Sequence, residues 1–148
     1  MSERIETAAL RDFSVSLCRA AGLSADDAAL LTDSILFAEC RGVTSHGLLR
    51  LPQYIARLRS GATAMNVPMP FTMESGGTAR LDAQNGLGQL AGRKASDKAE
   101  ELAAEYGVSF VAVANSNHFG TGAWYAIPAA QRGYFAFNIS SAASAMAP

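Results

Sequence analysis

The sequence lacks the features of a membrane protein and of a secreted one. No apolar run reaches the ~18 residues that a membrane-spanning helix needs, and the first six residues, Met-Ser-Glu-Arg-Ile-Glu, form no apolar signal region. The only two cysteines, Cys18 and Cys40, form no CxxC pair, and we expect both to be reduced thiols on apolar helix faces. These absences favour a cytoplasmic protein.

The chain also has few groups that bind nucleic acids or metals. Its net charge is −1 and its basic residues are interspersed with acidic ones, so no nucleic-acid-binding surface is expected. The only two histidines, His46 and His118, lie far apart in the sequence without paired carboxylates, which falls short of the spacing of a zinc site. GxGxxG, Walker and GxSxG motifs are absent, so the usual dinucleotide, nucleotide and serine-hydrolase motifs are excluded.

What the chain does contain is typical of a folded domain. Its 148 residues are 49% hydrophobic and 17% charged, which suffices for a buried core. Apolar residues recur every three or four positions and predict helices over 5–21, 24–40 and 45–61. The core-facing residues predicted for the first two helices are Ile5, Ala9, Phe13, Leu17 and Ala20, and then Leu30, Leu31, Ile35 and Ala38.

A change of pattern follows these helices. The Val-Pro-Met-Pro stretch at 67–70 is an extended linker, because each proline discourages helix in the residue before it. Two short strands over 71–74 and 79–82 are predicted to form a hairpin across Gly76-Gly77. A long helix over 87–106 comes next.

The last part of the chain has the pattern of a strand–helix–strand unit. Buried strands are predicted over 108–114 and 134–140, with a helix over 123–132 between them, and this crossover favours parallel strands. So small a sheet leaves its edges open and its faces bare. We therefore expect that the sequence is truncated or that another chain completes the sheet.

His46 is the first candidate for chemistry. It stands in the segment Arg-Gly-Val-Thr-Ser-His-Gly-Leu-Leu-Arg, at the expected start of a helix that would bring it onto one face with Arg50. A neutral imidazole is a natural proton donor or acceptor in a carbonyl/alcohol interconversion, and an arginine binds a carboxylate bidentately. On this local pattern alone, a histidine at a helix start is more often structural. Tyr54 and Trp124 are interpreted as packing aromatics.

Two polar segments follow the predicted buried strands, where α/β proteins gather their ligands. Residues 115–122, Asn-Ser-Asn-His-Phe-Gly-Thr-Gly, precede a helix and offer backbone amides to an anion. The alternative is a simple Asx-type turn made by Asn115 and Asn117. Residues 138–144, Asn-Ile-Ser-Ser-Ala-Ala-Ser, would lie beside that segment if the two strands are neighbours. Taken alone, they are more typical of a flexible loop.

Two of these segments together resemble a known family. Residues 41–54 and 115–120, in this order, are similar to the two hallmark segments of the malate/L-lactate dehydrogenase-like oxidoreductases, which lack the Rossmann fingerprint. The resemblance covers nearly the whole chain as an amino-terminal portion. It implies a non-Rossmann α/β fold of the L-sulfolactate dehydrogenase-like type. In that fold a helical amino-terminal segment (residues 1–66) precedes an incomplete mixed α/β layer (67–148), the first part of the cofactor-binding domain.

The resemblance also implies roles for individual residues. His46 would be the acid/base, oriented by Ser45, and Arg50 would help to position the substrate. His118 would lie at the nicotinamide or the substrate, and in the family this position is sometimes given the proton-acceptor role, so the choice between the two histidines stays open. The residues expected to contact NAD or NADP are Asn117, His118, Gly120, Ser140, Ser141 and Ala142. Relatives commonly have a hydroxyl or amide residue near position 142 and a proline near 144, so contact there is expected from the backbone.

The implied activity is that of an NAD(P)-dependent dehydrogenase. It would interconvert a small 2-hydroxy acid of the malate, lactate, ureidoglycolate or sulfolactate type and its 2-oxo acid, in a homodimer. Relatives are considerably longer, and their later portion supplies the rest of the cofactor site and an acidic partner for the catalytic histidine. We therefore expect this chain alone to be inactive. The alternative hypothesis is a non-catalytic truncated homologue that acts as a dimerisation or interaction domain.

Overall fold

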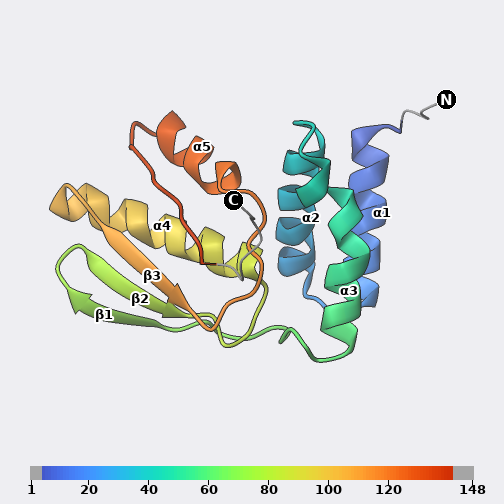
Figure 1. Cartoon of the computed structure of the whole chain (residues 1–148), viewed down its shortest axis with the longest axis horizontal. Helices are drawn as coiled ribbons and strands as arrows, with labels where there is room; N and C mark the ends of the chain where they lie inside the picture. Colours follow the sequence, from blue (N-terminus) through green and yellow to red (C-terminus); the bar gives the residue numbers. More distant parts are fainter. Residues whose placement is uncertain (1–4, 142–148) are drawn as a thin grey trace, which may run out of the picture.

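A computed structural model describes residues 5–141, without the side chains of residues 72–74 (Figure 1). Its first part is helical, and three α-helices lie side by side there with two single-turn 3₁₀ helices before the last of them. They are α1 (Thr7–Ala20), α2 (Ala25–Glu39), η1 (Thr44–His46), η2 (Leu48–Arg50) and α3 (Leu51–Arg59). Ser24 caps α2 as its sequence position suggests, because its hydroxyl accepts a hydrogen bond from the amide of Asp27 (3.1 Å).

The helix that was expected to begin near Ser45 begins later. The two 3₁₀ turns occupy residues 44–50, and the α-helix starts at Leu51 with Pro52 in its first turn. Proline suits this place because its missing N–H is one that the first turn leaves without a partner in any case. His46 therefore ends a separate short turn and is not part of α3.

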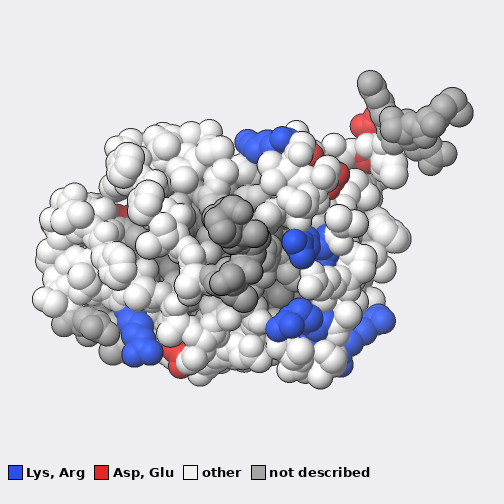
Figure 2. Space-filling model, viewed as in Figure 1, with Lys and Arg blue, Asp and Glu red and all other residues white. Residues whose placement is uncertain are grey.

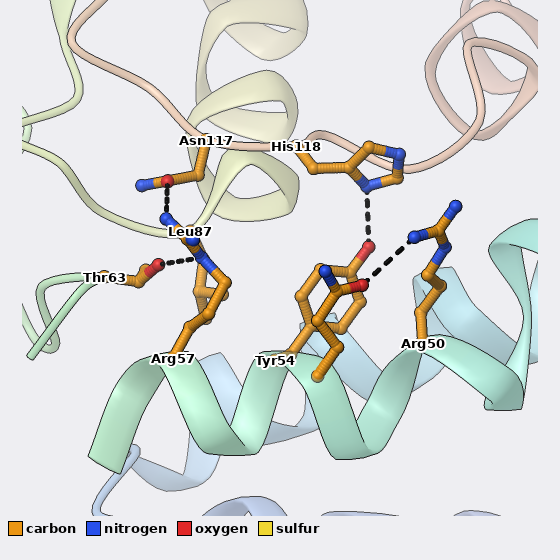
Figure 3. Close-up of a pocket in the computed structure, with 8 residues that line it drawn as sticks. Arg50, Tyr54, Arg57, Thr63, Leu87, Asn117 and His118 are labelled. Carbon is orange, nitrogen blue, oxygen red and sulfur yellow. Dashed lines mark hydrogen bonds between the residues drawn. The ribbon is translucent and has the colours of Figure 1, made fainter. Parts of the chain in front are cut away.

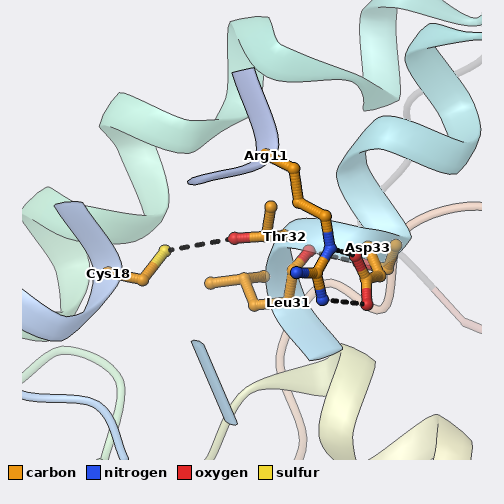
Figure 4. Close-up of polar contacts among 6 residues, drawn as sticks. Arg11, Cys18, Leu31, Thr32 and Asp33 are labelled. Atoms are coloured by element: carbon orange, nitrogen blue, oxygen red, sulfur yellow. Dashed lines mark hydrogen bonds and ion pairs between the residues drawn. The ribbon is translucent and has the colours of Figure 1, made fainter. Parts of the chain in front are cut away.

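The buried face of α1 differs from the predicted one. Ile5 and Phe13 are 62% and 60% exposed, whereas Ser14 and Cys18 are buried. Small side chains let α1 approach α2 closely, and Cys18 Sγ lies 3.9 Å from Thr32 Oγ1 (Figure 4). Apolar periodicity misplaced this face because it gave no weight to Ser14, which is polar but buried.

The predicted buried face of α2 is largely correct, but the predicted burial of Cys40 is wrong. The predicted core residues Leu31, Ile35 and Ala38 are buried, while Leu30 is only partly so. Cys18 is buried as expected, but Cys40 is exposed, because it lies at the end of α2 beyond the residues that face α1. On the outer side of the same helix pair, Arg11 and Asp33 form a two-pronged ion pair with N–O distances of 2.6 and 2.9 Å (Figure 4).

The second part of the chain contains a small mixed sheet with one helix layer. Its strands, in the spatial order in which they pair, are β1 (Phe71–Ser75), β2 (Thr78–Asp82) and β3 (Phe110–Ala114). The first two form the predicted antiparallel hairpin, with Phe71 opposite Leu81. The helices are α4 (Gly88–Tyr106), which Gly107 ends in a left-handed conformation, and α5 (Ala123–Gln131). β2 and β3 are parallel, and α4 forms the crossover between them.

Two strand predictions are wrong in part or entirely. Residues 134–140 form no strand, and Phe135 and Phe137 are 94% and 77% exposed. β3 is a strand but is not buried, since Phe110 is 63% exposed. The apolar pattern of both segments suits a strand covered on both faces, but within residues 5–141 the sheet has three strands and α4 covers one face (Figure 1). The parallel unit is therefore β2–α4–β3 and not the predicted one.

Two apolar clusters hold these parts together. One lies among α1, α2 and α3 and includes Leu31 and Leu58, but it also contains Leu87 from the start of α4. The other lies between α4 and β2, around Leu81, and Leu90 packs against both clusters. The start of α4 is thus anchored to the helices and to the sheet at once. The division of the chain after residue 66 into two domains stays a prediction.

On the face in Figure 2, basic side chains occur in separate small groups and form no continuous patch. Among residues 5–141 no helix is both long and apolar enough to cross a membrane.

Candidate active site

A cavity of about 270 Å³ opens between α3 and the loop that follows β3 (Figure 3). A cavity of this size suits a small organic acid and is too small for a whole dinucleotide. Its lining combines two arginines, a histidine, a tyrosine hydroxyl and three further polar side chains with one leucine. These residues are Arg50, Gln53, Tyr54, Arg57, Thr63, Leu87, Asn117 and His118.

The turn that carries His46 is held by polar contacts. Ser45 Oγ lies 2.9 Å from His46 Nδ1, and Arg50 Nε donates a hydrogen bond to the carbonyl of Ser45 (2.7 Å). Glu39 accepts a hydrogen bond from the amide of Leu48 (2.8 Å). Gly47 is required beside it, because a Cβ there would overlap the Glu39 carboxylate. These contacts fix the direction of the His46 ring and leave its Nε2 without a partner among the described residues.

His118 is held by the side chain of Tyr54. Its Nδ1 lies 2.7 Å from the Tyr54 hydroxyl and accepts a longer hydrogen bond from the amide of Gly120 (3.3 Å). An amide can only donate, so Nδ1 is the unprotonated nitrogen and Nε2 carries the proton of the neutral ring. Burial raises the pKa of Tyr54, which keeps its hydroxyl protonated as the second donor to Nδ1.

The charge state of His118 follows from its surroundings. Partial burial lowers the pKa of His118, and the nearby His46 and Arg50 lower this pKa further because they disfavour a positive charge on the ring. His118 is therefore neutral at pH 7. A neutral ring with Nε2–H offers a hydrogen-bond donor to a ligand without adding charge.

The structure brings the two histidines together. The ring centroids of His46 and His118 are 5.2 Å apart, with an angle of 31° between the ring planes. Ser45 and Arg50 lie with them, as the sequence suggested. Ser140 and Ser141 are exposed and form no hydrogen bond with another described residue, and Ala142 lies outside the described residues.

Asn117 ties the loop after β3 to two other segments. Its Oδ1 accepts a hydrogen bond from Arg57 Nη2 (2.9 Å), and its Nδ2 donates to the carbonyls of Asn85 (2.9 Å) and Gly86 (3.0 Å). The loop also needs a glycine at position 88, because a Cβ there would lie 2.2 Å from the carbonyl oxygen of Asn117. The Asn117 side chain thus anchors the loop to distant segments, which is more than a local Asx-type turn does.

Sequence reasoning missed the part of α3 that lines the cavity. Tyr54 was interpreted as a packing residue. Its ring is indeed buried, but its hydroxyl reaches His118. Arg57 was not singled out. The signal that would have found them is helical spacing, since Arg50, Tyr54 and Arg57 stand at i, i+4 and i+7 and share one helix face. Trp124 does pack, edge-on against Phe37 with ring centroids 5.2 Å apart.

Three side chains near the loop have buried polar groups without a partner in the described part of the chain. The amide of Gln89, the hydroxyl of Thr121 and the indole N–H of Trp124 are buried without a hydrogen-bond partner among the described residues. A Cβ on Gly120 would lie 3.8 Å from the Gln89 amide nitrogen, so this amide sits under the loop. Buried groups of this kind cost free energy until they are paired, and a nicotinamide, with a carboxamide of its own, fits such a site. Within residues 5–141 no group of three or more His, Cys, Asp and Glu side chains could hold a metal ion.

Comparison with known proteins shows the family of the chain. The family model described as malate/L-lactate dehydrogenase matches residues 5–148. The chain belongs to the malate/L-lactate dehydrogenase family. Among curated members, a malate dehydrogenase of Pyrococcus abyssi is 34% identical over 145 residues, which cover 98% of this chain and 40% of that protein. The (2R)-3-sulfolactate dehydrogenase (NADP(+)) of Chromohalobacter salexigens is 34% identical over 148 residues, which cover 100% and 44%.

Solved structures of the family share the fold. The malate dehydrogenase of Pyrococcus horikoshii OT3 matches with a TM-score of 0.85 at 32% identity, over 88% of this chain and 38% of that one. The sulfolactate dehydrogenase of Methanocaldococcus jannaschii matches with a TM-score of 0.81 at 32% identity, over 86% and 37%. The expected sulfolactate dehydrogenase-like α/β fold is confirmed. The chain spans less than half the length of the relatives that it matches.

Proposed function

We propose that this chain carries the acid/base and substrate-anchoring residues of an NAD(P)-dependent oxidoreductase that interconverts a small 2-hydroxy acid and its 2-oxo acid. The observation that supports this most is the pairing of His46 and His118, 5.2 Å apart, beside a cavity that Arg50 lines. A ring that can transfer a proton, a second ring that can donate a hydrogen bond and a nearby cation suit a carbonyl/alcohol interconversion on a carboxylate substrate. The malate and sulfolactate dehydrogenases among the relatives support the same class of substrate.

Each polar group has a place in this reaction. Arg50 binds the carboxylate of the substrate through its Nη2, which has no acceptor among the described residues. His46, held at Nδ1 by Ser45, gives a proton from Nε2 to the substrate oxygen on reduction and removes it on oxidation. His118 donates a hydrogen bond from Nε2 to the same oxygen or to the cofactor. Tyr54 is a positioning residue that holds the His118 ring at its Nδ1.

The cofactor is proposed to be NAD or NADP. When bound, it supplies the hydride donor or acceptor for C2 of the substrate. The residues proposed to hold it are Asn117, His118 and Gly120 of the loop after β3, with Ser140 and Ser141 further along the chain; Ala142, outside the described residues, completes the set. The name of the sulfolactate dehydrogenase relative supports a nicotinamide cofactor and leaves the choice between the two forms open.

The alternative is a non-catalytic domain that dimerises or binds a partner. The observation that favours it is the row of exposed apolar side chains at Phe135, Phe137 and Ile139, which are 94%, 77% and 71% exposed. The same surface also suits the homodimer that the family resemblance implies. Measuring turnover by the full-length protein distinguishes the two functions, because an oxidoreductase must turn over substrate and a domain that only dimerises or binds a partner need not. The homodimer and the cytoplasmic location stay predictions.

Hydride transfer is the direct test of the proposed function. The full-length protein is mixed with NADH or NADPH and a panel of small 2-oxo acids, and the absorbance of the reduced cofactor is followed. We expect oxidation with at least one acid and a KM raised about tenfold or more in Arg50→Gln, since a charge-assisted hydrogen bond to the substrate is lost. Arg59→Gln is the matched control, because Arg59 lies on the same helix outside this cavity. A protein that oxidises neither cofactor with any acid would overturn the proposal.

A further inference from the structure

Two arginines, one just before α3 and one within it, line the same cavity. Arg50 immediately precedes the helix and Arg57 follows two turns later, and both lie on the face that carries Tyr54 (Figure 3). The proposed function uses only Arg50. Arg57 is therefore a second cationic group in the site without an assigned role.

Neither arginine is neutralised by the protein. No carboxylate lines the cavity, and no described Asp or Glu forms an ion pair with Arg50 or Arg57. Arg50 donates hydrogen bonds from Nε to the Ser45 carbonyl and from Nη1 to Gln53, so its Nη2 has no acceptor among the described residues. Arg57 donates hydrogen bonds from Nε and Nη2, and its Nη1 has no acceptor among the described residues. Each guanidinium thus keeps one amino group without an acceptor among the described residues.

Arg57 is held in place although it is exposed. Its Nε donates to Thr63 Oγ1 (3.2 Å), and its Nη2 donates to the carbonyl of Ala62 (3.2 Å) and to Asn117 Oδ1 (2.9 Å). All three acceptors are neutral, so these contacts orient the cation without cancelling its charge. A guanidinium fixed before a ligand arrives loses less side-chain entropy on binding than a free one does.

We propose that Arg57 binds a second anionic group of the substrate and so selects 2-hydroxy or 2-oxo acids that carry a negative charge at both ends. This inference rests on the proposed function for the role of Arg50, which binds the carboxylate beside the reacting carbon. The second group is a carboxylate or a sulfonate, because both present oxygens to a guanidinium. An apolar substituent would leave the Arg57 Nη1 without an acceptor, and an uncharged polar one would leave the charge of Arg57 uncompensated.

The spacing of the two arginines along the chain suits a short dianion. Seven residues correspond to about 10 Å along a helix axis. A four-carbon diacid with a hydrogen bond of about 2.8 Å at each end spans a distance of that order. Tyr54 and Gln53 lie between the two arginines along the chain and leave the middle of the cavity uncharged. His118, above Tyr54, then faces the middle of the bound acid.

The test compares two unreactive four-carbon acids that differ in one charged group. Succinate, with two carboxylates, and butyrate, with one, are titrated calorimetrically into the full-length protein and into its Arg57→Gln and Arg59→Gln variants at low ionic strength. We expect the wild type to bind succinate about tenfold more tightly than butyrate, the gain from one charge-assisted contact on an exposed arginine. Arg57→Gln brings the ratio close to one, and Arg59→Gln leaves it unchanged.

Several results would overturn the inference. They are a ratio near one in the wild type, a ratio that survives Arg57→Gln, and no binding of either acid at millimolar concentrations. A loss of NADPH or NADH affinity in Arg57→Gln with an unchanged ratio would assign Arg57 to a cofactor phosphate instead. Arg57→Lys guards against misfolding, because it keeps the charge and is expected to retain part of the preference. The test uses no turnover, so a failure of this inference can be told apart from a failure of the proposed function.

Discussion

The hydroxyl of Tyr54 lies 2.7 Å from Nδ1 of His118 and joins a buried ring of α3 to the loop that follows β3. These two residues are far apart in the sequence, and neither one alone predicts the contact. It matters because a histidine can act in catalysis only when its tautomer and direction are fixed. The packing of α3 against the core therefore also sets the geometry of the candidate site.

Replacing Tyr54 by Phe tests this contact. The ring stays in the core, but His118 loses its stronger hydrogen bond, and we expect kcat of the full-length protein to fall roughly tenfold. The thermal stability should change little. Tyr106→Phe is the matched control, since Tyr106 is an exposed residue at the far end of α4. An unchanged kcat in Tyr54→Phe would show that the contact has no part in catalysis.

The pKa of His118 gives a second prediction. Burial, His46 and Arg50 hold the pKa of His118 below the ordinary value of about 6.5. An NMR titration of the ring protons should show this directly, and His46→Gln should raise the pKa of His118 because the neighbouring ring that helps to lower it is gone. A pKa at or above the ordinary value in the wild type would contradict the burial seen here.

The lowered pKa of His118 also makes the stability of the fold depend on pH. The unfolded chain binds a proton at the ordinary pKa and the folded chain only at the lower one, so the free energy of unfolding falls as the pH drops between these two values. Below the folded pKa this contribution levels off. Urea unfolding at several pH values should show the slope in the wild type and a smaller one in His118→Gln.

Gly88 supplies a third prediction. A Cβ at this position would lie 2.2 Å from the carbonyl oxygen of Asn117 and 2.5 Å from that of His118, so Gly88→Ala must push the loop away from α4. We expect lower stability together with a large loss of activity. Gly122→Ala serves as the control, because its Cβ would make only an ordinary contact of 3.7 Å with Asn138. Equal activity of the two variants would mean that the position of the loop is not critical.

Local signals predicted most of the fold. Gly76-Gly77 indicated the hairpin, and Gly107 indicated the end of α4, because both depend on backbone conformations that few other residues adopt. Residues 134–140 were predicted wrongly, since their apolar alternation indicates a strand only where a neighbouring strand is available. Among the described residues, no strand pairs with residues 134–140.

The candidate site was predicted in part for a similar reason. His46 and His118 could be named because each stands in a distinctive short motif. Arg57 could not, because its neighbours in the cavity come from the loop that contains Asn117, and only the fold brings them together. Its helical spacing from Arg50 was visible in the sequence, but that spacing is equally typical of a solvated helix face.

The most direct test of the proposed chemistry is the turnover of His46→Ala in the full-length protein. Thr44→Ala is measured beside it, since Thr44 is an exposed neighbour whose side chain forms no hydrogen bond with another described residue. If His46 moves the proton, kcat for reduction of the best 2-oxo acid falls by about two to four orders of magnitude in His46→Ala and stays near the wild-type value in Thr44→Ala. A His46→Ala enzyme with near-normal kcat would contradict the account.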